Sequence, residues 1–177
     1  MNLDTLLVYG KSFMVNGVEE TKGFIKKSGS LTSSLYSEAL FKGFFETKVR
    51  NGDVVSDETG SFLVRGAHGY DWIQCILLKT NTVLNVKRSE EIEDEYGNIK
   101  REWVTKADNV PAMQQKVTTK LREENPGILD NVTHLFHFQL CDVQKGDRLY
   151  IGEIYFNVEF VDEVTNPGLV IVQVSSI

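Results

Sequence analysis

Two short segments of the chain share the pattern V-x-x-G-D: residues 49–53 read VRNGD, and residues 143–147 read VQKGD. Gly-Asp is typical of a turn that starts a strand. The segments lie 94 positions apart, and the same offset, without a gap, aligns further apolar positions. It aligns Phe41 with Leu135, Phe62 with Phe156, Val64 with Val158, and the run Cys75–Leu78 with Leu169–Val172. Each copy therefore predicts a turn, a strand, a loop and a fully apolar strand.

The repeat predicts two related β modules, over residues 1–82 and residues 83–177. Each copy supplies strands with one buried face, which need a facing sheet or closure into a barrel. We therefore expect a mainly β fold of two small β-barrel or sandwich modules with one or two short helices. The modules form either separate barrels or one merged sandwich. The alternative is that two Gly-Asp turns agree by chance in a strand-rich chain.

A period of two in the apolar residues predicts about ten strands along the chain. Turns separate them, and glycine is favoured in turns because it adopts positive φ without steric cost. The turn Asn16-Gly17 corresponds to Gly97-Asn98 if the second copy contains extra residues between this turn and its V-x-x-G-D segment. The predicted turn residues are Asn16, Gly17, Gly52, Asp53, Gly97, Gly146, Asp147 and Gly168.

Two segments show helical spacing instead. Residues 34–45 place Tyr36, Leu40 and Phe44 at i, i+4 and i+8 and predict a helix, although its second half fits a strand equally well. Residues 114–124 follow the same spacing and predict a short helix.

The composition excludes several classes of protein. No stretch approaches about 18 consecutive apolar residues, so we expect no transmembrane helix. The first residues lack a basic region followed by an apolar segment, so we expect no signal peptide and synthesis in a reducing cytoplasm. The two cysteines, Cys75 and Cys141, are too few for a disulfide scaffold, and we expect both to be buried free thiols.

Acidic residues outnumber basic ones, 25 to 19, which gives a net charge of −6. Proteins that read a DNA sequence neutralise phosphates with clustered Lys and Arg, whereas the longest basic clusters here are pairs. We interpret the pairs Lys26-Lys27, Lys87-Arg88 and Lys100-Arg101 as solvated faces. We interpret the acidic residues 90–95 as the solvated edge of a hairpin, where charge discourages edge-to-edge pairing.

Few residues suggest chemistry. His134 and His137 lie three apart in a strand-like run, so they point to opposite faces and cannot share a metal. His68, Asp71 and Cys75 suggest a Cys-His-Asp triad, but Cys75 opens an apolar strand, and reactive thiolates need an exposed, electropositive setting. No nucleotide-binding or hydrolase motif occurs. We therefore expect no catalytic residue, no metal site and no cofactor.

The second module carries a series of short motifs. Residues 93–99 form an acidic Tyr-Gly turn, Trp103 follows, and residues 109–112 read NVPA. Residues 145–149 read KGDRL, and residues 155–158 read YFNV. In this order the motifs resemble those of the head–tail connector proteins of tailed bacteriophages, of the head-closure or adaptor type. The resemblance spans residues 83–177 and implies a small β-barrel, a strand over residues 110–115, and no catalytic activity.

The resemblance also implies partners. Identical copies would form a closed ring between portal or adaptor and tail-terminator proteins, in the neck of a virion made in a bacterial cytoplasm, without contact with a membrane. DNA would pass through the ring without sequence-specific contacts, and lumen-facing acidic residues would repel its phosphates. The expected contact loops are residues 66–71 and 123–131. The interface residues we single out there and beside them are Gly66, His68, Tyr70, Trp72, Glu123 and Asn125.

The second hypothesis is a soluble binding module. A double β-barrel would bind a peptide, a sugar or a single-stranded nucleic acid on an aromatic surface. The expected platforms are Tyr70-Asp71-Trp72 and Trp103. This hypothesis predicts that a ligand changes the tryptophan fluorescence, whereas the connector hypothesis predicts no such change.

Overall fold

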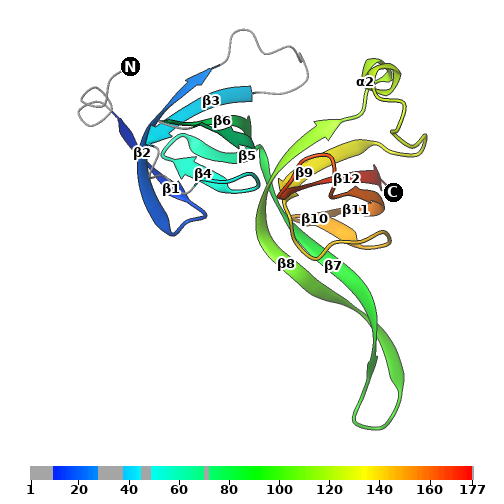
Figure 1. Cartoon of the computed structure of the whole chain (residues 1–177). Helices are drawn as coiled ribbons and strands as arrows, with labels where there is room; N and C mark the ends of the chain where they lie inside the picture. Colours follow the sequence, from blue (N-terminus) through cyan, green and yellow to red (C-terminus); the bar gives the residue numbers. More distant parts are fainter. Residues whose placement is uncertain (1–9, 28–37, 45–48, 70–71, 177) are drawn as a thin grey trace. The chain divides into compact units, whose positions relative to one another are not determined.

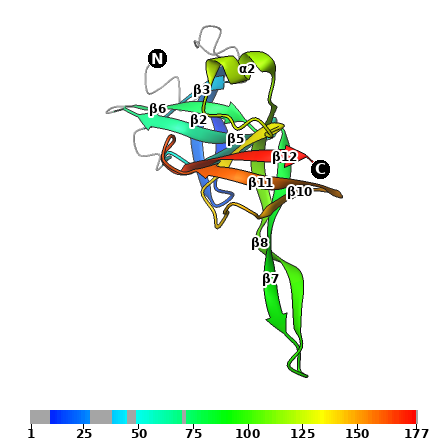
Figure 2. The ribbon, with the colours of Figure 1, turned by 90° about the vertical axis from the view of Figure 1, so that its right-hand side faces the viewer.

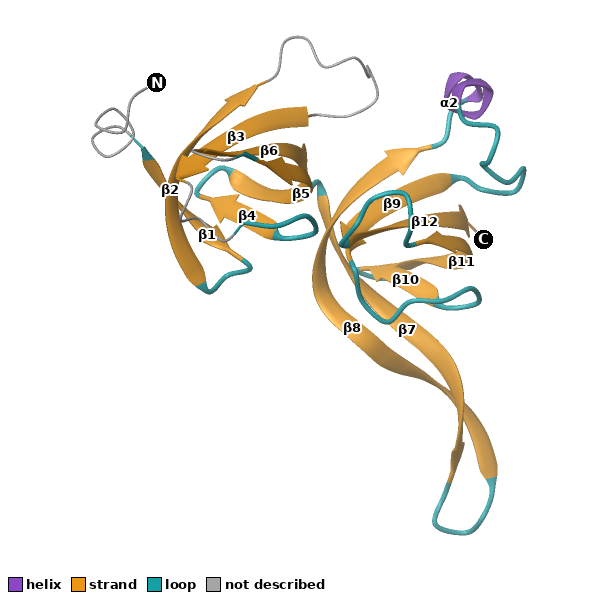
Figure 3. Cartoon of the chain, viewed as in Figure 1, coloured by secondary structure: helices purple, strands orange, loops and turns teal. Residues whose placement is uncertain are grey.

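The computed structural model describes residues 10–27, 38–44, 49–69 and 72–176. These residues form almost entirely β structure (Figure 3). Their twelve strands close into two barrels of six strands each. This architecture confirms the predicted fold of two small β-barrel modules, and the barrels are separate rather than merged into one sandwich.

The first barrel has the strand order β1-β2-β3-β6-β5-β4, and β1 pairs with β4 to close it. All its paired strands are antiparallel. Its strands are β1 (Lys11–Val15), β2 (Glu19–Lys27), β3 (Glu38–Phe44), β4 (Val54–Asp57), β5 (Gly60–His68) and β6 (Trp72–Lys79).

The second barrel repeats this order as β7-β8-β9-β12-β11-β10, and β7 pairs with β10 to close it. Its strands are β7 (Thr82–Glu93), β8 (Ile99–Lys116), β9 (His134–Gln139), β10 (Arg148–Ile151), β11 (Ile154–Asp162) and β12 (Leu169–Ser176). A helix, α2 (Thr119–Glu124), lies between β8 and β9. Within the described ranges, no helix has the length and apolar character needed to cross a membrane.

The V-x-x-G-D segment occupies the same place in both barrels, before the fourth strand. Gly52 N donates to the carbonyl of Val64 (2.8 Å), and Gly146 N donates to that of Val158 (3.0 Å). In return, Val64 N donates to the carbonyl of Asp53 at 2.8 Å, and Val158 N donates to the carbonyl of Asp147 at 2.9 Å. Both glycines have positive φ, 88° and 92°, which disfavours other residues there. The repeat in the sequence is therefore a repeat of hydrogen bonds.

The chain divides into two compact units. The first contains residues 1–81 and Val164–Leu169, and the second contains Thr82–Glu163 and Val170–Ile177. The boundary between Asn81 and Thr82 lies one residue from the one we drew from the sequence. The short segment between β11 and β12, which includes the turn residue Gly168 (φ 80°), groups with the first unit, and the sequence pattern did not indicate this.

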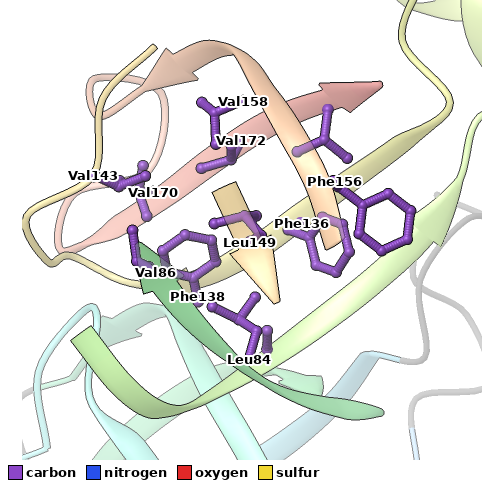
Figure 4. Packing of buried hydrophobic residues seen from close by; sticks show 12 residues of the cluster. Leu84, Val86, Phe136, Phe138, Val143, Leu149, Phe156, Val158, Val170 and Val172 are labelled. Carbon is purple, nitrogen blue, oxygen red and sulfur yellow. The ribbon is translucent and has the colours of Figure 1, made fainter. Parts of the chain in front are cut away.

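Each barrel encloses an apolar core of its own. The second core gathers side chains from all six strands and from the loop before β10, as Figure 4 shows. Its labelled members include Leu84 and Val86 of β7, Phe136 and Phe138 of β9, and Leu149 of β10. Alternate residues of each strand face inward, which is the physical origin of the period of two in the sequence.

The first core depends on a close approach of an aromatic ring to a glycine. Phe41 of β3 is fully buried, and its ring meets that of Phe13 edge to face with 5.3 Å between centroids. Gly23 of β2 is also buried, and the Phe41 ring occupies the space that a Cβ at residue 23 would need. Such a Cβ would also lie 2.8 Å from the carbonyl oxygen of Lys42. Only glycine fits at this position of β2.

The helix predicted over residues 34–45 is wrong where the structure describes it, because residues 38–44 form β3. Ala39, Phe41 and Gly43 are buried in alternation, and β3 pairs on both sides, with β2 and β6. Residues 34–37 and 45 lie outside the described residues. The spacing of Leu40 and Phe44 fits a helix, but the burial follows the competing period of two.

The second predicted helix is shorter than residues 114–124. β8 continues through Lys116, as the resemblance implied, and α2 begins at Thr119. Thr118 caps it, because its hydroxyl oxygen accepts a hydrogen bond from Leu121 N (3.2 Å). Leu121 is the buried residue of α2.

We predict that Gly23→Ala destabilises the first barrel by about 1–3 kcal/mol, because the methyl group forces the Phe41 ring or the strand backbone to move. Urea unfolding followed by circular dichroism measures the change. Gly66→Ala is the matched control in the same barrel, since its Cβ would meet nothing closer than Ile76 Cδ1 at 3.9 Å. Equal unfolding free energies for the two variants would contradict the role assigned to Gly23.

Candidate functional site

The hairpin of β7 and β8 extends beyond the rest of the second barrel, as Figures 1 and 2 show. β7 and β8 have 12 and 18 residues, whereas the corresponding β1 and β2 have 5 and 9. β7 pairs with β10 only through Asn85–Lys87, and β8 pairs with β9 only through Ala112–Lys116. Residues 88–93 and 99–104 therefore pair only with each other in the described part of the chain. We call these two stretches, with the turn between them, the projecting hairpin.

Asp94 organises the tip of the projecting hairpin. Its side chain accepts hydrogen bonds from the amides of Asn98 and Tyr96, both at 2.9 Å, and Gly97 has a φ of 81°. These hydrogen bonds, first of all the one from the Asn98 backbone, lower the pKa of Asp94. The ring of Tyr96 is 88% exposed. The tip is thus a defined turn that presents an aromatic ring to solvent.

A buried ion pair holds the inner face of the hairpin where it leaves the barrel. Arg88 lies two residues after the inward-facing Val86, so it points the same way. Its Nε and Nη2 donate to the two carboxylate oxygens of Asp147, both at 2.9 Å, and Nη2 also donates to Asp142 Oδ1 at 2.9 Å. The Asp147 side chain is 1% exposed. The hydrogen bond with Asp147 raises the pKa of Arg88 still further, so the guanidinium stays charged.

On the outer face of the hairpin, opposite Arg88, aromatic rings alternate with cationic side chains. The Arg148 guanidinium lies between the rings of Trp103 and Tyr155, 4.0 and 4.1 Å from their centroids. Tyr155 stacks on Tyr150 at 5.4 Å, and Lys87 Nζ lies 4.7 Å from the Tyr150 centroid. Cation–π contacts of this kind contribute about 0.5–1 kcal/mol each at exposed positions. The stack connects the hairpin strands to β10 and β11.

The two faces are held by consecutive residues. Asp147 and Arg148 are neighbours in the chain, so their side chains point to opposite sides of the strand. A two-stranded ribbon alone is marginally stable in water, and these contacts extend the rigidity of the barrel into it. We call the residues that make them the hairpin base: Arg88, Trp103, Asp142, Asp147, Arg148 and Tyr155.

The corresponding hairpin of the first barrel, β1 and β2 as the structure describes them, does not project in this way. Asp53, the counterpart of Asp147, accepts a hydrogen bond from the side-chain Nδ2 of Asn16 at 2.8 Å, in the place where Asp147 accepts from the Arg88 side chain. Asn16 and Gly17 have φ of 51° and 71° and turn the chain directly into β2. Gly97 makes the corresponding turn only at the far end of the projecting hairpin. The extra length of the second copy is therefore concentrated in this hairpin.

The first of the expected contact loops is mostly not a loop. Gly66 and His68 belong to β5, which continues through a register shift between Val64 and Gly66. Tyr70 lies outside the described residues, and β6 begins at Trp72. A glycine beside a bulge lets a strand bend without ending, so Gly66 does not start the loop expected over residues 66–71.

The second expected loop starts later than predicted and is anchored. Glu123 lies in α2, and Asn125 is its C-cap. Arg122 Nη1 donates to the carbonyl of Leu129 at 2.6 Å, and Leu129 N donates to Gln173 Oε1 at 3.0 Å. These bonds tie residues 125–132 to the helix and to β12.

The remaining candidates are not part of the hairpin base. His134 and His137 both belong to β9, and nowhere in the described ranges do three metal-ligating side chains cluster. Cys75 is fully buried, and burial, assisted by the charge of Asp53, raises the pKa of its thiol to about 12. The thiolate that a Cys-His-Asp triad would need is therefore not available near neutral pH. Cys141 is half-buried, and burial raises the pKa of its thiol to about 11.

The sequence indicated Asp147 as a turn residue but not the role of Arg88. We had interpreted Lys87-Arg88 as a solvated pair, which is wrong for Arg88, whose side chain is only 18% exposed. The available signal was its spacing from Leu84 and Val86, which places it on the inward face. Its partner lies 59 residues away in the chain, and periodicity does not identify such a partner.

Comparisons with known proteins return no relative. No protein-family model matches the chain, and neither does any curated protein or solved structure.

We predict that Asp147→Asn destabilises the second barrel by about 3 kcal/mol, because it leaves the buried side of the Arg88 guanidinium without its charge partner. The remaining pair with Asp142 limits the loss. Asp142→Asn, whose side chain is 63% exposed in the parent, is the control and should cost less than about 1 kcal/mol. Urea unfolding measures both, and a larger effect for Asp142→Asn would contradict the assignment.

We also predict that the second barrel loses stability as the pH falls from about 7 to about 5. Burial, with the charge of Lys116, lowers the pKa of His134. The unfolded chain therefore binds a proton at a higher pH than the folded chain does. As the pH falls below the ordinary histidine pKa, protonation stabilises the unfolded state and lowers the free energy of unfolding. This loss ends at the pH where His134 of the folded chain is protonated as well. His134→Gln should flatten this dependence, measured by unfolding across the pH range. An unchanged slope would show that another group is responsible.

Proposed function

We propose that this chain is a structural subunit of the neck of a tailed bacteriophage or prophage particle, where copies form a ring that closes the DNA-filled head and docks the tail. One observation carries the proposal. The motif residues behind the resemblance, Trp103, Asp147, Arg148 and Tyr155, come from three separate motifs and meet at the hairpin base. Their common role is to hold a rigid arm on a closed barrel.

The architecture is compatible with mechanical work in an assembly. Closed barrels leave no free strand edge except on an element that projects from them, so the hairpin is the natural contact element. The negative charge also lies in this half of the chain. Residues 82–177 hold 16 of the 25 acidic residues and 10 of the 19 basic ones. A ring of such subunits would disfavour adhesion of DNA phosphates.

The aromatic residues of the outer face favour the binding module as a second candidate. Trp103, Tyr150 and Tyr155 form one surface, and aromatic rings of this kind can stack on bases or sugars. The Trp103 ring already carries Arg148 on one face and is 37% exposed. Titration with single-stranded DNA, followed by tryptophan fluorescence, tests this candidate directly. Its Trp103→Phe variant serves as the control.

Electron microscopy of particles from a prophage-carrying host that lacks this gene tests the connector proposal. We expect heads that lose their DNA beside complete but detached tails, because neither the closure nor the docking surface is present. Supplying the wild-type gene in trans should restore tailed particles, and the protein should then be found in purified virions. Normal tailed particles without this protein would refute the proposal.

A further inference from the structure

The projecting hairpin has two strand edges that no described strand covers. Beyond Lys87, β7 has β8 as its only neighbour, and before Ala112, β8 has β7 as its only neighbour. Around each barrel the strands otherwise form a closed ring, in which every strand pairs on both sides along at least part of its length. Uncovered edges present rows of N–H and C=O groups that favour pairing with another strand.

The orientation of these backbone groups follows from the tip. Asp94 N donates to Asn98 O at 2.9 Å, so these two groups point into the hairpin. Because antiparallel pairs alternate, the backbone groups of residues 89, 91 and 93 of β7 point outward, and so do those of residues 99, 101 and 103 of β8. Each edge thus offers three residues to a neighbour.

The two edges carry opposite charge. Apart from Arg88 of the hairpin base, the charged residues of the β7 arm, residues 88–93, are Glu90, Glu91 and Glu93. The β8 arm, taken as residues 99–106, carries Lys100, Arg101 and Lys106 against one acidic residue, Glu102, so its net charge is positive. Within one hairpin, Arg101 pairs with Glu91 at 3.0 Å, and Lys106 pairs with Glu90. The Arg101 and Glu91 side chains are 76% and 57% exposed, so this pair contributes little stability by itself and is open to a second partner.

We propose that the projecting hairpins of neighbouring copies pair edge to edge, with the β8 arm of one copy antiparallel to the β7 arm of the next. The inference rests on the proposed function for the association of copies. In each hairpin β7 runs from the barrel to the tip and β8 runs back. Copies related by rotation would therefore place the β8 arm of one copy beside a β7 arm that runs in the opposite direction, as an antiparallel ladder needs. The basic arm would then face the acidic arm, and the contact would repeat head to tail until the ring closes.

Charge also selects this arrangement over its alternatives. Two acidic β7 edges would repel each other, and so would two basic β8 edges, so like edges do not pair. A single peptide strand would cover one edge and leave the other open. Further copies of the chain cover both edges, because the neighbour on each side presents the complementary arm. It would also shield the apolar Ile92 and Ile99, which are 40% and 69% exposed.

The test exchanges the charges of the two arms in the full-length chain. The variant E90K/E91K/R101E/K106E retains each pair within its own hairpin but reverses the sign of both edges. Wild-type copies and exchanged copies are each expected to associate among themselves. Mixed with isotopically labelled wild type and analysed by native mass spectrometry, they should form mixed oligomers about tenfold less often than random mixing gives.

A second variant tests the backbone contact. Arg101→Pro removes an outward-pointing N–H and leaves the inward ladder of the hairpin, whereas Arg101→Ala removes the same charge and keeps the N–H. The proline variant should lose association to a much greater extent than the alanine variant, with circular dichroism showing that both fold. Equal association of the two variants would show that the edge is not paired.

Two results would overturn the inference. Random mixing of exchanged and wild-type copies would place the contact elsewhere, and a chain that stays monomeric up to its solubility limit would exclude pairing of the hairpins. Neither result decides the role in the particle, which the gene-deletion experiment reports separately. Conversely, edge pairing together with normal particles from the deleted host would retain the inference and refute the neck function.

Discussion

The second barrel depends on one buried carboxylate. Asp147 accepts a hydrogen bond from Gln144 N and so closes the turn before β10, and it holds the Arg88 guanidinium through both oxygens. Burying such a pair brings little net stability, because desolvation offsets most of the Coulombic gain. Its effect is positional: it determines where β7 leaves the barrel. The next residue, Arg148, holds the other face through Trp103 and Tyr155, so a single dipeptide orients the projecting hairpin.

The two barrels show how a repeated fold acquires different hairpins. Both use the same turn and the same aspartate, which accepts a hydrogen bond from the amide three residues earlier, at 2.7 Å in the first barrel and 2.8 Å in the second. In the first barrel the aspartate meets the amide group of Asn16, and the chain turns back at once. In the second it meets Arg88, and the strand continues to Glu93. Similar cores therefore support a short hairpin in one copy and a projecting hairpin in the other.

The projecting hairpin offers backbone groups for further strand pairing. The strands around each barrel pair in a closed order, whereas the two outer edges of the hairpin have no described neighbour. Three glutamates lie on its β7 arm, and basic residues outnumber the single acidic residue, Glu102, on its β8 arm. This difference disfavours the pairing of like edges and permits that of unlike edges. The hairpin base makes this arrangement useful, because an arm held on both faces presents its edges in a defined direction.

The sequence by itself determined most of the strands, the glycine turns and the presence of two related modules, because a period of two and a positive φ are properties of neighbouring residues. It also determined that Asp53 and Asp147 occupy equivalent turns. Only the tertiary structure decided that residues 38–44 are a strand, since pairing with β2 and β6 outweighs their helical spacing. It likewise placed Arg88 in a buried ion pair rather than on a solvated face. Strand pairing and burial depend on residues far apart in the chain, and local patterns do not contain that information.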